Sequence, residues 1–315
     1  MRALVVCNPG ARGGRGARAL PGVLGRLRGL GIEAEVHRTV SMDDARAAAC
    51  GAAGSVDVVA AMGGDGLVGA CAAGLAQFAE AAGHAGQRPG TPAALAVIPA
   101  GAGNDAARTL GIPLGDQAAA AALLPSLVRR RADLARVGDR HYLNVAGAGF
   151  DSEVNRLANE RLARAPSRVR YVGALLAELA VHRPATFTLT LDGEPREVRA
   201  WFMVVANGPS YGGGMRIAPD ARVDDGLLDV VVVDGALPRL GFLAAFPKVF
   251  SGRHVDLPAV SVHRVSRVEV AADRPLSVYA DGEWHGPLPE VFQSCPAAIE
   301  VLAAEGAPGF TRPPA

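Results

Sequence analysis

The hydrophobic pattern of about the first 130 residues alternates between two periods. Short apolar runs of strand length are followed by longer stretches whose leucines and alanines recur at helical spacing. The pattern predicts strands at residues 2–8, 32–39, 56–62 and 93–100, and helices at residues 17–31, 42–54 and 67–83. Such alternation predicts a parallel sheet with helices on both faces. Ligands of these sheets bind beyond the carboxyl ends of the strands.

After about Ala132, strand-like runs follow one another and are joined by Gly, Pro and Asp turns. The expected strands lie within residues 141–150, 185–208, 226–233, 265–272 and 276–284, and the two expected helices lie around residues 155–182 and 241–250. This pattern predicts a second, mostly antiparallel domain. The expected units are residues 1–132, residues 133–305 and a frayed tail at 306–315. We interpret the basic run 127–134 as the end of a helix, where positive charge complements the dipole.

Composition narrows the classes of protein that fit this pattern. Half of the 315 residues are apolar, and the formal net charge of +1 gives no reason to expect a nucleic-acid partner. The first apolar run is too short for a signal peptide, and no apolar stretch reaches the roughly 18 residues of a membrane span. We therefore expect a cytoplasmic protein that at most visits a membrane. The histidines lack zinc-site spacing, and four separate buried thiols are expected at Cys7, Cys50, Cys71 and Cys295.

Three glycine-rich loops follow predicted strands, at residues 8–16, 63–69 and 99–105. Glycine permits positive φ and has no Cβ, so backbone N–H groups can converge on an anion. A helix that starts directly after such a loop adds the positive end of its dipole. Each loop alone also fits a simple tight turn. Together they predict a phosphate-binding site at one edge of the sheet.

The glycines of the second loop also satisfy the dinucleotide pattern G-x-G-x-x-G, through Gly64, Gly66 and Gly69. The match follows the third strand instead of the first, and the next strand ends in "AVIPAG", without the acid that would contact a ribose. A Walker A loop is absent, because no G-K-[ST] follows the glycines. A dinucleotide enzyme is therefore the weaker interpretation.

Asp65 stands at the centre of the second loop. A carboxylate within an anion-binding turn would repel phosphate unless a cation lies between them, so Asp65 favours a nucleotide bound with Mg²⁺ over a bare phosphate. The alternative is that Asp65 caps a helix starting at Leu67, which is a common use of aspartate. The two roles are compatible.

Five motifs in fixed order carry a resemblance to a known family: "VVAAMGGDG", "LAVIPAGAGNDAARTLGIP", "YLNVAGAGFDSEV", "NGPSYGGGMRIAPDARVDDGLLDVVVV" and "YADGEW". From Asn8 to about Glu283 the chain resembles the diacylglycerol kinase catalytic-domain family, which includes bacterial diacylglycerol kinases, related lipid kinases and sphingosine kinases. The resemblance implies an α/β nucleotide-binding domain like that of NAD kinases and phosphofructokinases, followed by a β-sandwich, with the active site in the cleft between them. It also implies Mg²⁺-dependent transfer of the ATP γ-phosphoryl group to a lipid hydroxyl.

The resemblance also implies roles for individual residues. The positions that match nucleotide-binding residues are Asn8, Thr39, Gly63, Gly64, Asp65, Gly66, Gly101, Ala102, Gly103, Asn104 and Asp105. Asp65 is expected near the catalytic Mg²⁺. Glu283 matches the carboxylate that accepts the proton of the attacking hydroxyl, with Asp281 beside it. A second, structural Mg²⁺ is implied at Asp225 and at the main-chain carbonyls of Arg222 and Leu227.

Phosphoryl transfer needs charge neutralisation, alignment and a proton acceptor, and these residues supply all three. Plainer interpretations remain for two of them. The sequence "ADGEW" also fits the Asp-Gly turn of a hairpin, which would make Glu283 a turn residue. Asp224 and Asp225 also fit solvated acids of a loop.

The chain departs from the family pattern at four positions. Leu67, Gly69 and Ala70 replace the Thr, Asn and Glu that usually follow G-G-D-G, and Ala102 replaces the Thr of the second loop. Each replacement removes a polar group, and a hydrogen bond to a charged group is worth about 1.5–3 kcal/mol. These losses favour weak ATP affinity, a different phosphoryl donor, or a protein that binds without catalysing.

The acceptor is specified less closely. The apolar helix 168–182, preceded by Arg161, Arg164 and Arg168, could bring the protein to anionic headgroups, or it could pack in the core with solvated arginines. A soluble alcohol acceptor fits the same residues as a lipid. Strand edges in the second domain could also pair two chains into a homodimer.

Overall fold

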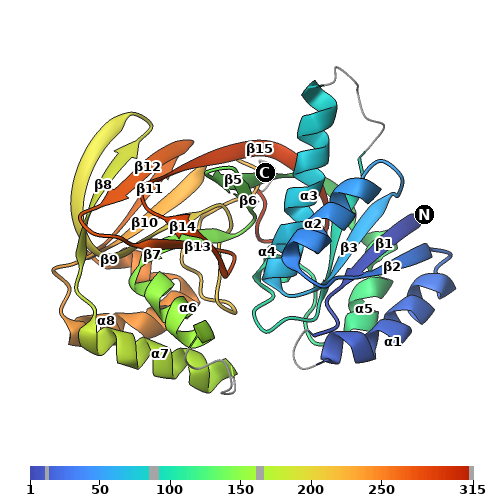
Figure 1. Ribbon diagram of the computed structural model, residues 1–315. Coiled ribbons are helices and arrows are strands. Elements are labelled where there is room, and N and C mark those ends of the chain that lie inside the picture. The colour runs from blue at the N-terminus through green and yellow to red at the C-terminus, as the bar shows by residue number, and fades with distance from the viewer. Residues whose placement is uncertain (11–13, 85–91, 161–166, 312–315) are drawn as a thin grey trace.

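The computed structural model describes residues 1–10, 14–84, 92–160 and 167–311. Two groups of elements lie side by side, an α/β group at the N-terminus and a group built mostly of strands after it (Figure 1). Strands of both groups belong to one continuous sheet, in the order β14-β13-β7-β9-β8-β12-β15-β4-β3-β1-β2. The predicted fold class is confirmed.

The N-terminal sheet consists of four parallel strands in the order β4-β3-β1-β2. These strands are β1 (Arg2–Cys7), β2 (Glu33–Arg38), β3 (Val58–Gly63) and β4 (Ala94–Pro99). The helices are α1 (Arg15–Gly29), α2 (Met42–Ala52), α3 (Asp65–His84), α4 (Asp105–Thr109) and α5 (Gln117–Ala122). Strands β3 and β4 are buried at every position, because α2 and α3 cover one face of the sheet while α1 and α5 cover the other. The predicted alternation of strands and helices is confirmed.

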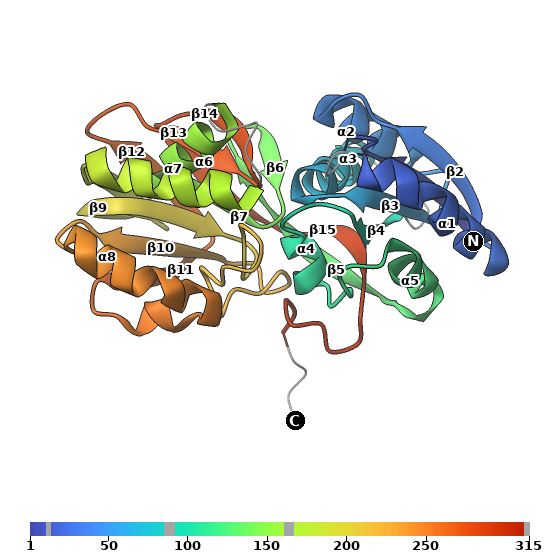
Figure 2. The ribbon, with the colours of Figure 1, turned by 90° about the horizontal axis from the view of Figure 1, so that it is seen from below.

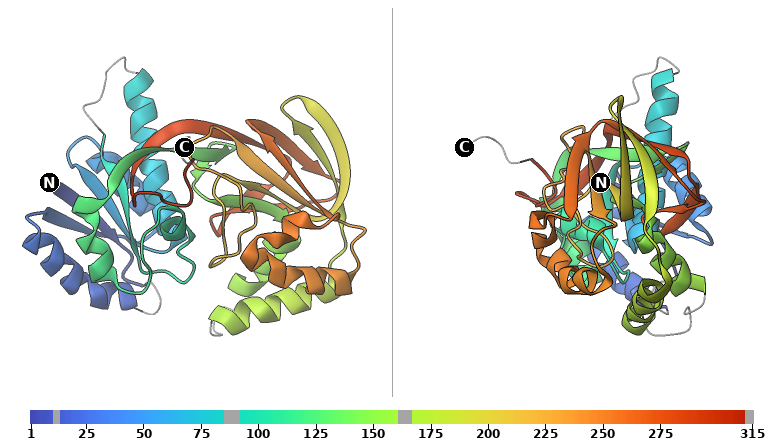
Figure 3. Two further views of the ribbon diagram at one scale, coloured as in Figure 1. Left: turned by 180° about the vertical axis from the view of Figure 1, so that it is seen from behind. Right: turned by 90° about the vertical axis from the view of Figure 1, so that its left-hand side faces the viewer.

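The C-terminal group pairs its strands antiparallel. Its strands are β5 (Val128–Val137), β6 (Arg140–Tyr142), β7 (Val145–Gly149), β8 (Ala185–Leu191), β9 (Glu194–Ala206), β10 (Leu228–Asp234), β11 (Val260–Val265), β12 (Arg267–Ala272), β13 (Ser277–Ala280), β14 (Glu283–Pro287) and β15 (Glu290–Ala303). Its helices are α6 (Phe150–Glu160), α7 (Ser167–Val181) and α8 (Arg239–Ala245), with 3-10 helices at Leu124–Ser126, Phe246–Ser251 and Arg253–Asp256. Helices α7 and α8 lie next to one another on one face of the strands (Figures 2 and 3).

Two long strands join the groups. β5 pairs with β15 along both ends of β15, and β15 curves from one group to the other (Figure 1). At its far end β15 pairs in parallel with β4, where Val301 lies opposite Leu95. The last strand of the chain therefore belongs partly to the N-terminal sheet. The division at residue 132 lies within β5 and stays a prediction.

Three expectations about individual segments are wrong. The basic run 127–134 is not the end of a helix, since it lies in β5, where Arg129 pairs with Glu300 of β15 at 2.5 Å. The helix expected around residues 155–182 is two helices, of which α6 begins already at Phe150. The segment around residues 241–250 begins as α8 and continues as a 3-10 helix with Pro247 in its first turn.

The expectation of a frayed tail is also wrong, as far as residue 311. Ala307 and Phe310 are buried, and the Thr311 N–H donates to Asp224 Oδ1 at 2.7 Å. The four cysteines are unpaired as expected, but only Cys7 and Cys71 are buried, while Cys50 and Cys295 are half-buried.

Candidate active site

The second and third glycine loops and the described start of the first follow the carboxyl ends of β3, β4 and β1, which are neighbouring parallel strands. The second and third loops touch directly, because a Cβ on Gly101 would lie 2.2 Å from the Cα of Gly64. Only glycine permits this approach. Asn104 adopts a left-handed backbone with φ of 59° and holds the turn by accepting from Gly101 N–H and donating to Gly101 C=O, both at 2.8 Å. Ala102 follows Gly101 in this loop and is exposed.

The first loop and the end of β2 lie at the same edge. Asn8 Oδ1 accepts from Gly10 N–H at 2.9 Å, which closes a tight turn after β1. Thr39 follows β2, is buried, and donates its hydroxyl to Ser41 C=O. The side-chain groups of both residues therefore shape their own turns. Their expected contact with a nucleotide stays a prediction.

Asp65 is the first residue of α3, so the helix does not begin at Leu67 as the capping alternative required. The Asp65 carboxylate instead accepts from the N–H of Ala106, in the first turn of α4, at 2.9 Å. Burial raises the pKa of Asp65, and the nearby charge of Asp105 raises it further. Leu67 is 2% exposed and packs in the core, so this position does not face a ligand.

Asp105 links the two groups of elements. Its carboxylate is 2% exposed and accepts from the N–H groups of Gly213 and Gly214, each at 2.7 Å. These glycines belong to the "YGGGM" loop, in which three successive positive φ angles turn the N–H groups toward one anion. Gly103 adjoins the same carboxylates, because a Cβ there would lie 2.7 Å from Asp65 Oδ2 and 3.1 Å from Asp105 Oδ2.

Asp281 lies in the turn between β13 and β14, where φ is 48° at Asp281 and 87° at Gly282. Its carboxylate accepts from the N–H groups of Leu143 at 2.7 Å, Asn144 at 3.0 Å and Val145 at 3.3 Å. Burial and the charge of Asp65 nevertheless raise its pKa to about 6. The Asp-Gly hairpin turn predicted from "ADGEW" is confirmed.

This hairpin turn lies over the start of α3. A Cβ on Gly66 would lie 3.2 Å from Glu283 Oε1, and a Cβ on Gly69 would lie 3.0 Å from Asp281 Oδ2. Glu283 itself is exposed. The glycine loop and the acidic turn, which are more than two hundred positions apart in the sequence, therefore face one another. Gly69, which replaces a polar residue of the family, is what permits the close approach of Asp281.

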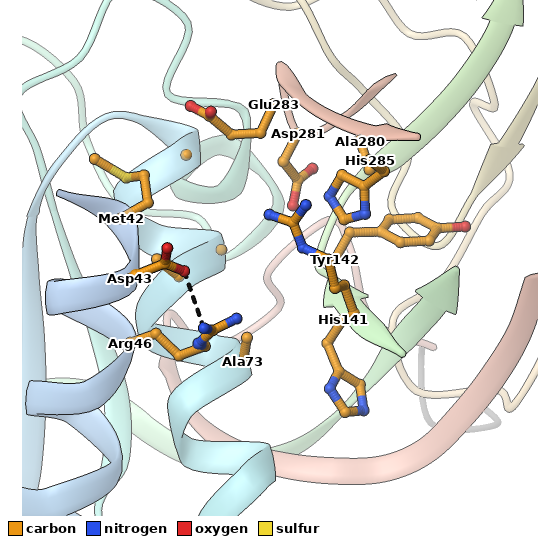
Figure 4. Close-up of a pocket in the computed structure, with 14 residues that line it drawn as sticks. Met42, Asp43, Arg46, Ala73, His141, Tyr142, Ala280, Asp281, Glu283 and His285 are labelled. Carbon is orange, nitrogen blue, oxygen red and sulfur yellow. Dashed lines mark ion pairs between the residues drawn. The ribbon is translucent and has the colours of Figure 1, made fainter. Parts of the chain in front are cut away.

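A pocket opens between α2 and α3 on one side and β6 and the hairpin on the other (Figure 4). It is lined by Met42, Asp43, Arg46, Gly66, Gly69, Ala70, Ala73, Arg140, His141, Tyr142, Ala280, Asp281, Glu283 and His285. The small residues of α3 form its floor, and Asp43 pairs with Arg46 at 2.9 Å at its rim. Burial and the charge of Arg140 lower the pKa of His285 to about 4, so this imidazole is neutral near pH 7.

Asp151 is a partly buried acid that the sequence reasoning did not single out. It lies in the first turn of α6, and its Oδ1 has no hydrogen-bond partner. Burial raises the pKa of Asp151 to about 7, and its charge also raises the pKa of Tyr211 in the "YGGGM" loop. One helical turn later, Asn155 donates to Gly282 C=O at 3.4 Å, so α6 adjoins the acidic turn. The sequence signal was a lone aspartate after an apolar run, which is too common to identify such a site.

The residues of the expected structural Mg²⁺ site lie close together, but their polar side chains bond to other groups of the protein. Asp225 accepts from Leu227 N–H at 3.0 Å and pairs with Arg264, while the Arg222 guanidinium donates to Ala221 C=O at 2.8 Å. Among the residues that the structure describes, no three acids, histidines or cysteines are grouped to hold a metal. With Arg264 neutralising Asp225, the donor set does not fit Mg²⁺ as it stands, and this site stays a prediction.

Asp224 and Asp225 are not solvated loop acids. Their side chains are only 15% and 14% exposed. Asp224 pairs with Arg130 at 3.0 Å and accepts from Thr311.

The arginines expected to contact a membrane cannot be placed. Arg161 and Arg164 lie outside the described residues, and Arg168 lies in α7 without a described side chain. No helix in the described part of the chain is long and apolar enough to span a membrane.

Family models match both halves of the chain. The diacylglycerol kinase catalytic domain matches residues 2–137, and the YegS C-terminal NAD kinase beta sandwich-like domain matches residues 144–303. A solved structure from Bacillus anthracis str. Sterne superimposes with a TM-score of 0.78 at 25% identity, covering 97% of this chain and 96% of that one. A diacylglycerol kinase structure from the same organism gives a TM-score of 0.72 at 22% identity, covering 97% and 98%. The latter likeness supports the fold alone.

Curated relatives extend over almost the whole chain. A diacylglycerol kinase of Mycobacterium tuberculosis (strain ATCC 25618 / H37Rv) is 36% identical over 94% of this chain and 93% of its own length. A diacylglycerol kinase of Bacillus subtilis (strain 168) is 28% identical over 96% of both chains. The resemblance inferred from the five motifs is confirmed: the chain belongs to the diacylglycerol kinase family of lipid kinases.

Proposed function

We propose that the protein transfers the γ-phosphoryl group of ATP, with Mg²⁺, to the hydroxyl of a lipid of the diacylglycerol class. The site lies between the two groups of elements. One observation carries the proposal: the loop that contains Asp65 lies against Glu283, the first residue of β14, because a Cβ on Gly66, the residue after Asp65, would lie 3.2 Å from Glu283 Oε1. A carboxylate on each side of a phosphate-binding loop is what phosphoryl transfer to an alcohol requires.

The donor phosphates bind at the glycine loops. Gly64 and Gly66 are partly exposed and carry no side chain, and α3 starts within the second loop, at Asp65, with its positive dipole end at the site. These donors are backbone groups, so they do not depend on the polar side chains that the chain lacks at Leu67, Gly69 and Ala70. We therefore expect ATP to bind, with lower affinity than an intact loop would give.

The oxygens available for Mg²⁺ fit its chemistry. The N–H of Ala106 bonds to Asp65 Oδ1, which leaves Asp65 Oδ2 for Mg²⁺. Mg²⁺ typically takes one or two carboxylates together with substrate phosphates and waters. When bound, it neutralises the phosphate charge that Asp65 would otherwise repel.

Glu283 is placed to accept the proton of the acceptor hydroxyl. It extends from the hairpin toward Gly66, and Asp281 fixes the turn through three backbone N–H groups. Because the turn is held by backbone groups of the segment before β7, Glu283 keeps its position while its carboxylate stays free. The alcohol oxygen then attacks the γ-phosphorus as its proton passes to Glu283, the bond between the γ-phosphorus and the β,γ-bridging oxygen breaks, and ADP leaves with that oxygen.

The test is transfer of labelled γ-phosphate from ATP to diacylglycerol in mixed micelles. We expect Asp65→Asn and Glu283→Gln to fold normally and to lose about 100-fold or more in kcat. Glu269→Gln, on an exposed residue of β12, is the matched control and should retain full activity. Full activity in both site variants would contradict the proposed roles. ATP binding without turnover on lipids or soluble alcohols would instead select a binding protein, the alternative that Gly69 and Ala70 favour.

A further inference from the structure

Asp151 carries an oxygen atom that the fold itself does not use. Its Oδ1 is buried and has no hydrogen-bond partner among the described residues. An unpartnered buried polar atom is uncommon in folded proteins, and strongly perturbed acids gather at functional sites. The proton acceptor and the metal-side carboxylate proposed above are other residues. Asp151 is therefore a candidate for contact with a ligand.

The backbone around Asp151 makes room for its side chain. A Cβ on Gly147 of β7 would lie 2.3 Å from Asp151 Oδ2, so any side chain at this position would displace the carboxyl group. The Ser152 hydroxyl donates to the Gly147 C=O at 2.7 Å and ties the start of α6 to the same strand. With Oδ2 resting on the strand, Oδ1 is the atom that remains for a ligand.

Two contacts place Asp151 beside the candidate active site. Helix α6 packs against β13 (Figure 2), and Asn155, one helical turn after Asp151, donates to Gly282 C=O in the turn that carries the proposed proton acceptor. On the other side lies Tyr211 of the "YGGGM" loop. Burial raises the pKa of Tyr211, and the charges of Asp151 and Asp105 raise it further. Asp151 therefore lies between the acidic hairpin and the loop that bonds to Asp105.

The surroundings of Asp151 are apolar. Phe150 and Val204 are buried members of the hydrophobic cluster between α6 and the strands, and Val154 packs at its edge. Such surroundings disfavour a charged carboxylate and suit the acyl chain next to an ester group. Burial raises the pKa of Asp151 to about 7, so its carboxyl group is protonated for much of the time near neutral pH.

The charged groups around Asp151 are engaged with one another. The other titratable side chains that the structure describes on α6 and α7 and just after α7 include two hydrogen-bonded pairs, which are Glu153 with Arg156 at 2.9 Å and Glu178 with His182 at 2.8 Å. Tyr211 is neutral at pH 7, because its pKa is raised. Among the described residues no cation pairs with Asp151. When it is protonated, its carboxyl group is a hydrogen-bond donor that still needs an acceptor.

We propose that the protonated carboxyl group of Asp151 donates a hydrogen bond to an ester carbonyl of the acceptor, and that this bond selects acylglycerols over other lipid alcohols. The ester groups of a diacylglycerol lie only a few bonds from its hydroxyl. A carbonyl oxygen accepts from a neutral carboxylic acid without any charge being buried. The proposal rests on the proposed function, because it names the part of the acceptor that the same site recognises.

The test compares two acceptors that share the hydroxyl and differ in the ester. They are dioctanoylglycerol and the dioctyl ether of glycerol, which has no carbonyl group. We expect the wild type to prefer the ester about tenfold in kcat/KM at pH 6. Asp151→Leu should lose this preference by losing rate on the ester alone, and its activity on the ether shows that it is folded. Asp151→Asn keeps an N–H donor and should retain the preference.

The preference should also depend on pH. Asp151 holds its proton below its folded-state pKa of about 7 and loses it above, so the wild type should lose most of the preference between pH 6 and pH 8.5. Asp151→Asn should keep it at both pH values. Glu153→Gln, on the same helix, is the matched control and should behave as the wild type does. An equal loss of rate on ester and ether in Asp151→Leu would show a structural role and overturn the proposal.

Binding without ATP separates this proposal from the proposed function. Calorimetric titration with the two acceptors should show the same preference in Kd. Preferred binding of the ester without transfer to either acceptor overturns the proposed function alone. Transfer at equal rates to ester and ether, in the wild type and in Asp151→Leu, overturns the role of Asp151 alone. Loss of the preference in Asp151→Asn would show that an ionised carboxylate accepts a bond from the ligand, and the proposal would be wrong.

Discussion

The acids at the candidate site are held mainly by backbone N–H groups. Asp65 accepts from Ala106, Asp105 accepts from Gly213 and Gly214, and Asp281 accepts from three consecutive residues before and in β7. Backbone donors fix a carboxylate without cancelling its charge. The site therefore keeps a negative potential that a divalent cation can satisfy, which is the condition for bringing ATP phosphates next to these residues.

Asp151 should make folding stability depend on pH. Its folded-state pKa of about 7 exceeds the ordinary aspartate value of 3.8, so the folded protein binds this proton more tightly. The stabilisation is present at low pH and is lost as the pH rises from about 4 to about 7. Asp151→Asn carries no charge, so its stability relative to the wild type should improve between pH 4.5 and pH 8 by about 3 kcal/mol.

Urea denaturation at both pH values measures this change. Glu153→Gln, on the same helix but partly exposed and paired with Arg156, is the control and should show a much smaller change. A difference between wild type and Asp151→Asn that does not vary with pH would show that Asp151 is charged throughout, or that an unseen cation compensates it.

Gly103 should be intolerant of any side chain. A Cβ there would lie 2.7 Å from Asp65 Oδ2, so Gly103→Ala must displace Asp65 or the loop. We expect a loss of about 1–3 kcal/mol in stability and of at least roughly tenfold in kcat. Gly51→Ala in α2 is the control: no atom lies within 4 Å of its Cβ, and it should stabilise by up to about 1 kcal/mol. An unchanged kcat in Gly103→Ala would show that Asp65 does not take part in catalysis.

At the residue scale, sequence reasoning found the acids that lie within glycine motifs and missed the one outside them. Asp65 was located because a carboxylate in an anion-binding glycine turn calls for a cation, and Asp281 was located through the "YADGEW" motif of the family resemblance. Asp151 stands in "GFDSEV", where nothing local distinguishes a buried acid from a solvated one. Leu67 shows the opposite error, because its position next to the loop suggested a ligand contact, whereas the helix turns its side chain into the core.

At the scale of elements, the N-terminal strands and helices were predictable because each has one clear hydrophobic period. β5 was not, because three of its arginines follow one another and imitate a charged helix end. What places them in a strand is β15, which is about 160 positions later in the chain and supplies the partner ladder and Glu300. Such long-range pairing overrides local preference.

Asp105 should hold the third glycine loop and the "YGGGM" loop together. Asp105→Asn keeps the size of the side chain but replaces one acceptor oxygen by an NH₂ group, which cannot accept from Gly213 or Gly214. We expect a loss of about 1–3 kcal/mol in stability. Hydrogen exchange at residues 211–215 should become faster at the same time.

Asp116→Asn is the matched control for this substitution. Asp116 caps α5 through Oδ1 alone, which accepts from both Ala118 and Ala119, so the amide oxygen of asparagine can replace it. If exchange at residues 211–215 stays slow in Asp105→Asn, another contact holds the two loops together.

At the scale of the whole molecule, the C-terminal segment fastens the two groups of elements to each other. The Gly309 N–H donates to the C=O of Thr109, the last residue of α4, at 3.0 Å, and the Gly309 C=O accepts from Val223 N–H at 2.8 Å. Phe310 is 2% exposed, and the Arg130 guanidinium lies over its ring, with Arg130 Cζ 4.1 Å from the ring centroid. This segment was expected to be loose because its Gly and Pro content resembles that of a frayed end, and its partners lie far away in the sequence.

Phe310→Ala should therefore destabilise the molecule as a core substitution does. Removal of a buried phenylalanine costs about 3–5 kcal/mol, and the lost cation–π contact with Arg130 adds up to about 1 kcal/mol. Phe250→Ala removes an equally large side chain that is 54% exposed, and it should cost less than about 1 kcal/mol. Guanidinium denaturation compares the two.

Because Phe310 contacts β5, and the same segment bonds to the end of α4 and to Asp224, the loss of its side chain should also loosen the candidate active site and raise the KM for ATP. An equal and small effect of both substitutions would show that the segment covers the surface without fastening it.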